Sequence, residues 1–85
     1  MESNVHMAHA DDNVGIVIKE IAAGEAVVVS ADVQLIARKP IPRYHKAALT
    51  PITKGSPIIK YGETIGHAEE DIQPGDHVHI HNMGA

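Results

Sequence analysis

The sequence predicts a small, mainly β domain built from short strands and many turns. Phe, Trp and Cys are absent, so the core has to consist of Val, Ile, Leu and Ala, and the β-branched members of that set favour strands. A turn motif recurs along the chain, and no segment shows the 3.6-residue apolar period of an amphipathic helix. At 85 residues, the chain is expected to form one domain, residues 1–85.

The recurring motif is an Ile, two residues, a Gly, two more residues and a β-branched residue. It covers Ile21–Val27, Ile52–Ile58 and Ile72–Val78. The Gly suits the third position of a tight turn, where φ is positive, and Pro74 presets the second position of the last copy. The copies start 31 and then 20 residues apart, so we expect a folded-over β unit that reuses one corner, without the fixed period of a solenoid.

The expected elements follow from these corners. In chain order, the expected strands are residues 14–18, 27–29, 33–37, 58–61 and 78–81. Residues 38–43 are basic and contain two prolines, which predicts an exposed connector. Residues 44–49 and 66–71 are expected to form short helical turns at most. Residues 1–10 are expected to be a flexible N-terminus.

Charge and hydropathy argue against several classes of partner. The net charge of −4 arises from 7 basic and 11 acidic residues, which disfavours nucleic-acid binding because that needs clustered Lys and Arg. No apolar run reaches the length of a membrane span, and the first residues do not resemble a signal peptide. We therefore expect a cytoplasmic protein that binds neither nucleic acid nor a membrane.

Three histidines near the C-terminus stand at every second position: His77, His79 and His81. If residues 78–81 are extended, the three imidazoles share one face, while Val78 and Ile80 point into the core. Imidazole is a common metal ligand and a proton carrier near neutral pH. Alternate residues of a strand are roughly 6.5–7 Å apart, so two of these rings with a ligand from another strand form a more plausible metal site than all three. The alternative is a solvated strand face.

The candidate metal ligands are His79 and His81 together with His9, assisted by His45. His9 precedes Asp12, another candidate donor, and would join the terminal histidines if the first and last strands pair. The pair His45-Lys46 is a candidate for contact with an anionic substrate or with a partner, and the alternative is an exposed polar pair. No residue is identified as catalytic.

Short motifs spread along most of the chain match a known pattern. They are His9 with Asp12-Asn13-Val14, Ile41-Pro42, His45-Lys46-Ala47-Ala48-Leu49, Ile52, Gly55, Lys60-Tyr61-Gly62, Ile65-Gly66, Asp71-Ile72, Gly75, His77-Val78-His79 and His81-Asn82. With these motifs the chain resembles the small SAF-type β-clip domain of the altronate/galactarate dehydratase family. One position departs from that pattern, because Tyr44 stands where the family usually has Gly. If the Gly of the family has positive φ, Tyr44 is expected to reshape the loop.

The resemblance implies a function as the small subunit or N-terminal domain of a sugar-acid dehydratase, a hydro-lyase of hexuronate catabolism. The implied partner is a large catalytic subunit or domain, without which the chain would be inactive. The implied substrate is a sugar acid, and the implied cofactor of the complete enzyme is a divalent metal, iron. Two alternative functions stay open: the small subunit of a sulfolactate sulfo-lyase, and a free-standing SAF-type carbohydrate-binding or ligand-binding module. A second copy of this chain, in a homo-oligomer, is a further candidate partner.

Overall fold

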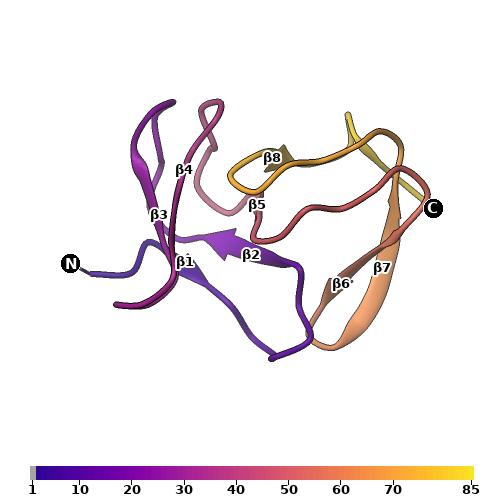
Figure 1. Ribbon diagram of the computed structural model, residues 1–85, viewed down its shortest axis with the longest axis horizontal. Helices are drawn as coiled ribbons and strands as arrows, with labels where there is room; N and C mark the ends of the chain where they lie inside the picture. The colour runs from indigo at the N-terminus through magenta and orange to yellow at the C-terminus, as the bar shows by residue number, and fades with distance from the viewer. Residues whose placement is uncertain (1) are drawn as a thin grey trace.

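The computed structural model describes residues 2–85 and consists of nine short strands joined by turns, with no helix in this range (Figure 1). The strands are β1 (Val5–His6), β2 (Val14–Val17), β3 (Ala26–Val28), β4 (Gln34–Ile36), β5 (Lys46–Ala48), β6 (Pro57–Lys60), β7 (Glu63–Ala68), β8 (His77–Val78) and β9 (Met83–Gly84). The expected mainly β fold is confirmed. Residues 44–49 and 66–71, expected to form helical turns, instead contain β5 and the end of β7.

The strands form three antiparallel sheets. The central one has the order β1-β2-β5-β8, and the others are β3-β4 and β6-β7-β9. In Figure 1 the two smaller sheets lie at opposite ends of the molecule, with the central sheet between them. Strand β5 is paired on both edges, with Val14 opposite Ala48 on one side and Val78 opposite Lys46 on the other.

The central sheet separates two apolar clusters. The first contains Val5, Val17, Ile21, Val27, Ala37, Ile41 and Ala47, and the second contains Val14, Ala48, Ile52, Ile58, Ala68, Ile72 and Val78. Ala47 and Ala48 are neighbours on β5 and point to opposite faces of the sheet, as successive strand residues do. Both are fully buried, so β5 contributes to both clusters at once.

A fourth corner joins the three expected from the sequence. The corners begin at Ile21, Ile41, Ile52 and Ile72, all of which are buried. The third turn position has a φ of 85° in Gly24, 70° in Tyr44, 88° in Gly55 and 89° in Gly75. Tyr44 therefore adopts the left-handed conformation of the other three corners, and the corner is kept despite the side chain.

The corners are arranged as two copies of one unit. Isolated bridges pair Ile21 with Ile41 and Ile52 with Ile72, so adding 31 to each number of the first pair gives the second. The same shift relates the hydrogen bond from Gly24 N to Ala37 O to the bond from Gly55 N to Ala68 O, both 2.8 Å long. It also relates the bond from Tyr44 N to Val17 O to the bond from Gly75 N to Ala48 O. The fold is thus an internal duplication.

The last expected strand ends earlier than predicted. Strand β8 stops at Val78, and Ile80, expected in the core, is 77% exposed. The buried side chain of Asn82 explains the difference: its Oδ1 accepts a hydrogen bond from His79 N at 2.9 Å, and its Nδ2 donates to His77 O at 2.8 Å. These bonds close a turn over residues 79–82, which rotates Ile80 out to solvent.

The expected flexible N-terminus, residues 1–10, contains strand β1, with Val5 opposite Val17 and only 2% exposed. Asn4 strengthens this attachment, since its side chain donates to Ala26 O at 2.9 Å and accepts from Val28 N at 2.8 Å. Met1 lies outside the described residues. Residues 4–6 are therefore part of the folded domain.

Replacing Gly75 with Ala should destabilise the domain more than replacing Gly24 with Ala. Both glycines have positive φ, but a Cβ on Gly24 meets no atom within 4 Å, whereas one on Gly75 would collide with the carbonyl oxygen of Ile36. Gly24→Ala should lower the free energy of unfolding by about 1 kcal/mol, from the cost of positive φ alone. Gly75→Ala should lower it clearly more. Urea unfolding of the two variants measures the difference, and equal losses would contradict the predicted clash.

Candidate functional site

The register of β5 against β8 brings histidines from two distant segments together. Lys46 is opposite Val78 and Ala47 is opposite His77. Continuing this antiparallel ladder by one residue places His45 opposite His79, with His77 as its diagonal neighbour. Residues directly opposite on one face lie close enough for their side chains to touch, so the sheet itself assembles the cluster.

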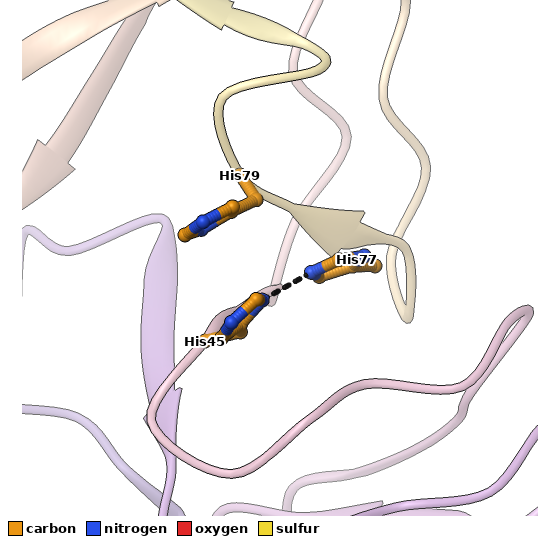
Figure 2. A group of neighbouring side chains, drawn as sticks. All are labelled: His45, His77 and His79. Carbon is orange, nitrogen blue, oxygen red and sulfur yellow. Dashed lines mark hydrogen bonds between the residues drawn. The ribbon is translucent and has the colours of Figure 1, made fainter.

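The imidazoles of this histidine cluster (His45, His77 and His79) are stacked (Figure 2). The ring centroids are 3.9 Å apart for His45 and His79, and 5.0 Å apart for His45 and His77. A fourth ring, His81, lies 4.9 Å from His77 at an interplanar angle of 41°. The four rings thus follow one another in the order His79, His45, His77 and His81.

His45 and His77 also share a hydrogen bond. The distance between His45 Nδ1 and His77 Nε2 is 2.8 Å (Figure 2). A neutral imidazole has one N–H donor and one acceptor nitrogen, so one of the two rings donates and the other accepts. A proton can therefore pass between the two rings over a short distance.

His79 has a ring nitrogen without a partner. Its Nδ1 is buried and has no hydrogen-bond partner among the described residues. Buried polar atoms are nearly always paired, and an unpaired one calls for an explanation such as an ion, a ligand or a water molecule. The third ring of the cluster thus has unused binding capacity.

Burial and neighbouring charges lower the pKa of two of the rings, those of His77 and His79. Burial lowers the pKa of His77 to about 4, helped by the positive charges that His81, His45, His79 and Lys46 would carry. The pKa of His79 is lowered by the same two causes, burial first and then the neighbouring cations. At neutral pH both rings are therefore free bases, the form that accepts protons and binds metals.

Lys46 stands apart from the rings although it follows His45 in sequence. Its register partner is Val78, so the side chain leaves β5 on the face of the second apolar cluster. Partial burial lowers the pKa of Lys46, and the charge of Lys60 lowers it further. The two residues expected to act as one pair lie on opposite faces of the sheet.

The remaining predicted ligands are placed differently. Three histidines, His45, His77 and His79, have ligand atoms that all lie within 4.8 Å of one another. His81 lies next to His77 but outside this group. His9 contacts the Gly62 turn between β6 and β7, and its Nδ1 accepts from Asp11 N at 3.1 Å. The structure thus combines His79 with His45 and His77, and leaves His9 outside the cluster.

Asp12, the other candidate donor near His9, has a structural role. Its carboxylate accepts hydrogen bonds from Gly62 N at 2.8 Å and from His9 N at 3.1 Å. Burial alone would raise the pKa of Asp12, but the backbone donors at Gly62, Tyr61 and His9 bring it below the ordinary value. Asp12 ties the N-terminal segment to the β6–β7 turn.

A pocket of about 250 Å³ adjoins the cluster. It is lined by Arg38, Lys39, Glu70, Asp71, Asp76, His77, His81 and Asn82. The two aspartates are engaged by backbone donors, Asp71 by Lys54 N and Asp76 by Gln73 N, and Asp76 also lies 3.4 Å from Arg38 Nη1. His77 therefore belongs both to the cluster and to a pocket with two cationic side chains.

The role of His45 and His77 together was missed from the sequence. Regular strand spacing singled out His77, His79 and His81 but could not show which strand lies beside them. The available signal was the fourth corner: Ile41, Tyr44 and Ala47 keep the spacing of the motif but lack its Gly. Recognising that corner would have placed His45 beside the start of a strand.

The depressed pKa of His77 should be visible in solution. Following the histidine ring signals by NMR as the pH falls, we expect His77 to titrate near pH 4, the folded value, and not near the model value of about 6.5. Between these two values the unfolded chain binds more protons at this residue, so stability should fall as the pH drops from 6.5 towards 4. His77→Gln should flatten that slope, and an unchanged slope would contradict the assignment.

Asn82→Ala should both destabilise the domain and displace His79. It removes the acceptor of His79 N and the donor to His77 O, two partners of a buried side chain, at a cost of about 1–3 kcal/mol. Asn82→Asp is the matched comparison because it keeps the acceptor oxygen. Urea unfolding gives the free energy, and the ring signals of His79 report its position; unchanged stability and signals would refute this role.

Among residues 2–85 there is no helix long and apolar enough to cross a membrane.

Comparison with known proteins gives consistent results. Residues 3–85 match the model of the altronate/galactarate dehydratase SAF domain. The chain is 48% identical over 75 residues to altronate dehydratase of Escherichia coli and 40% identical over 74 residues to that of Bacillus subtilis, covering 87% of this chain in each case. It spans only 15% of the length of these two relatives.

A third relative is of similar size to this chain. Subunit alpha of the (2R)-sulfolactate sulfo-lyase of Chromohalobacter salexigens is 36% identical over 80 residues, and the match covers 87% of this chain and 85% of that subunit. The relatives are thus lyases by name. With the family model matched over nearly the whole chain, this protein belongs to the altronate/galactarate dehydratase SAF domain family.

Proposed function

We propose that the chain is the small subunit or N-terminal domain of a sugar-acid dehydratase of the altronate/galactarate type, a hydro-lyase, and that it is inactive without a large catalytic part. The main support is the match of nearly the whole chain to a segment that makes up 15% of two altronate dehydratases. The small size of the domain also supports it, because its pocket of about 250 Å³ is below the usual range for a ligand site, about 300–1,000 Å³.

The chemistry of the histidine cluster suits this role. Dehydration of a sugar acid removes a proton α to a carboxylate and expels a β-hydroxyl group, which requires a base and an electrophile that holds the carboxylate. Because its pKa is lowered to about 4, His77 is a weak base at neutral pH, so in this proposal the base comes from the large part and the neutral imidazoles of the cluster serve as nitrogen ligands. A divalent metal, iron in this proposal, would supply the electrophile in the complete enzyme.

The proposed contact with the large part is the surface that carries the cluster. His45, His77 and His79 are half-buried at this surface, and Arg38 and Lys39 lie at the adjoining pocket together with three carboxylates. Lys46, on the other face of β5, adds to the effect of burial in lowering the pKa of His77 and His79. A cytoplasmic location is part of the proposal, since a chain without cysteine carries no mark of an oxidising compartment.

A second candidate is the small subunit of a sulfolactate sulfo-lyase. The observation in its favour is coverage: this chain spans 85% of subunit alpha of that enzyme in Chromohalobacter salexigens. Loss of sulfite replaces loss of water, while removal of the α-proton is common to both reactions. The two candidates therefore share a base and differ in the leaving group.

Turnover assays separate these candidates. The chain alone, and then the chain with each candidate large subunit, is assayed with altronate, galactarate and (2R)-sulfolactate. We expect activity only with the large subunit, on one of the three substrates. Full activity of the isolated chain, or no association with any large subunit, would refute the proposed division of labour.

Variants of the complex test the role of the cluster. His77→Gln should lower kcat by about 100-fold or more, beyond the effect of losing a bond that only supports a metal ligand, without weakening subunit association. His67→Gln is the matched control, since His67 is exposed on β7. An equal effect of both substitutions would remove the cluster from the reaction.

A further inference from the structure

We propose that His45, His77 and His79 form a three-imidazole site for one divalent transition-metal ion, such as Fe²⁺, Co²⁺ or Zn²⁺. This ligand set differs from His9, His79 and His81, the set that the sequence suggested. The site belongs to the 85-residue chain and does not depend on the identity of the large part or of the substrate.

The first support is the distance between the ligand atoms. One ring nitrogen of each histidine lies within 4.8 Å of the other two. Metal–nitrogen bonds of 2.0–2.1 Å in a tetrahedral site put the ligands about 3.4 Å apart. The three rings are half-buried, so side-chain rotation can make up the difference, while the antiparallel ladder holds the backbones in place.

The second support is the unsatisfied nitrogen of His79. Nδ1 is buried and has no hydrogen-bond partner among residues 2–85, and a ring nitrogen in that state is a free ligand. The nitrogens of His45 and His77, 2.8 Å apart, now share a proton. An ion between the rings would replace that shared proton and give all three nitrogens a partner.

The backbone around His79 supports the site from behind. The amide of His79 donates to Asn82 Oδ1, and the carbonyl of His77 accepts from Asn82 Nδ2. Two of the three proposed ligands are therefore fixed by one buried side chain. Such supporting bonds orient metal ligands in known sites and affect their affinity.

The composition of the site predicts which ions it takes. All three donors are imidazole nitrogens, and no carboxylate belongs to the group. Imidazole suits Zn²⁺, Fe²⁺ and Co²⁺, whereas Mg²⁺ and Ca²⁺ prefer oxygen ligands. Three protein ligands leave a position open for water or a substrate oxygen, as in catalytic metal sites.

Cobalt titration of the isolated chain tests this site. Co²⁺ is added to the metal-free protein while visible absorption and the histidine ring signals are recorded. We expect one equivalent to bind, with the bands of a nitrogen-ligated ion and selective shifts of His45, His77 and His79. Zn²⁺ should displace the Co²⁺, and Mg²⁺ should not. Uniform weak broadening of all seven histidines would overturn the proposal.

Substitutions then identify the ligands. His45→Gln, His77→Gln and His79→Gln should each weaken Co²⁺ binding by about 100-fold or more, beyond the effect of losing a supporting bond. His9→Gln, His81→Gln and His67→Gln should leave it within about threefold. Amide NMR spectra show which variants are folded. For a variant that does not fold, the shift of that histidine ring in the wild-type protein on addition of Co²⁺ decides whether it is a ligand. Loss of binding in His9→Gln or His81→Gln, with binding retained in His77→Gln, would assign the metal to the other set.

Because the titration uses the small chain alone, its outcome is separate from the outcome of the turnover assays. A bound ion without turnover in any complex would retain the site and reject the lyase role. Turnover that needs the large subunit, together with a chain that binds no Co²⁺, would reject the site and retain the lyase role.

Discussion

The pairing of β5 with strands on both of its edges is the constraint on which the rest of the structure depends. Through Ala47 and Ala48 this strand of three residues contributes to both apolar clusters. Its register against β2 joins the two halves of the internal duplication, and its register against β8 sets His45 opposite His79. A shift of one residue would reverse the faces of every side chain on β5. It would move Ala47 and Ala48 out of the clusters in which each now packs, and it would separate the imidazoles.

The corner that leads into β5 is the one without glycine. Tyr44 has a φ of 70°, a conformation that is costly for a residue with a Cβ. Its amide donates to Val17 O, and its exposed ring lies 4.6 Å from the guanidinium carbon of Arg43. The surrounding hydrogen bonds thus hold a strained residue directly before His45. Strain of this kind tends to persist at functional positions, in agreement with the location of the cluster.

The cluster joins two properties that the proposed lyase role requires. Burial and neighbouring positive charge lower the pKa of His77 and His79, so their nitrogens are free to bind a metal. The adjoining pocket adds charged side chains of both signs at the same surface, Arg38 and Lys39 together with three carboxylates. In the proposed function a larger catalytic part would cover this surface, because the domain alone offers a pocket of only about 250 Å³.

The sequence by itself determined the class of fold, the corners at Gly24, Gly55 and Gly75, and the grouping of the C-terminal histidines, because turn chemistry and strand alternation are local properties. It did not determine that β8 would stop at Val78. The strand ends there because the Asn82 side chain bonds to the backbone of His77 and His79, and the turn closed by these bonds competes with an extended strand. Nor did it determine the partner of His79. Which strands pair, and in which register, is decided by the burial of two apolar clusters over the whole chain, and only that packing brings His45 to the rings of His77 and His79.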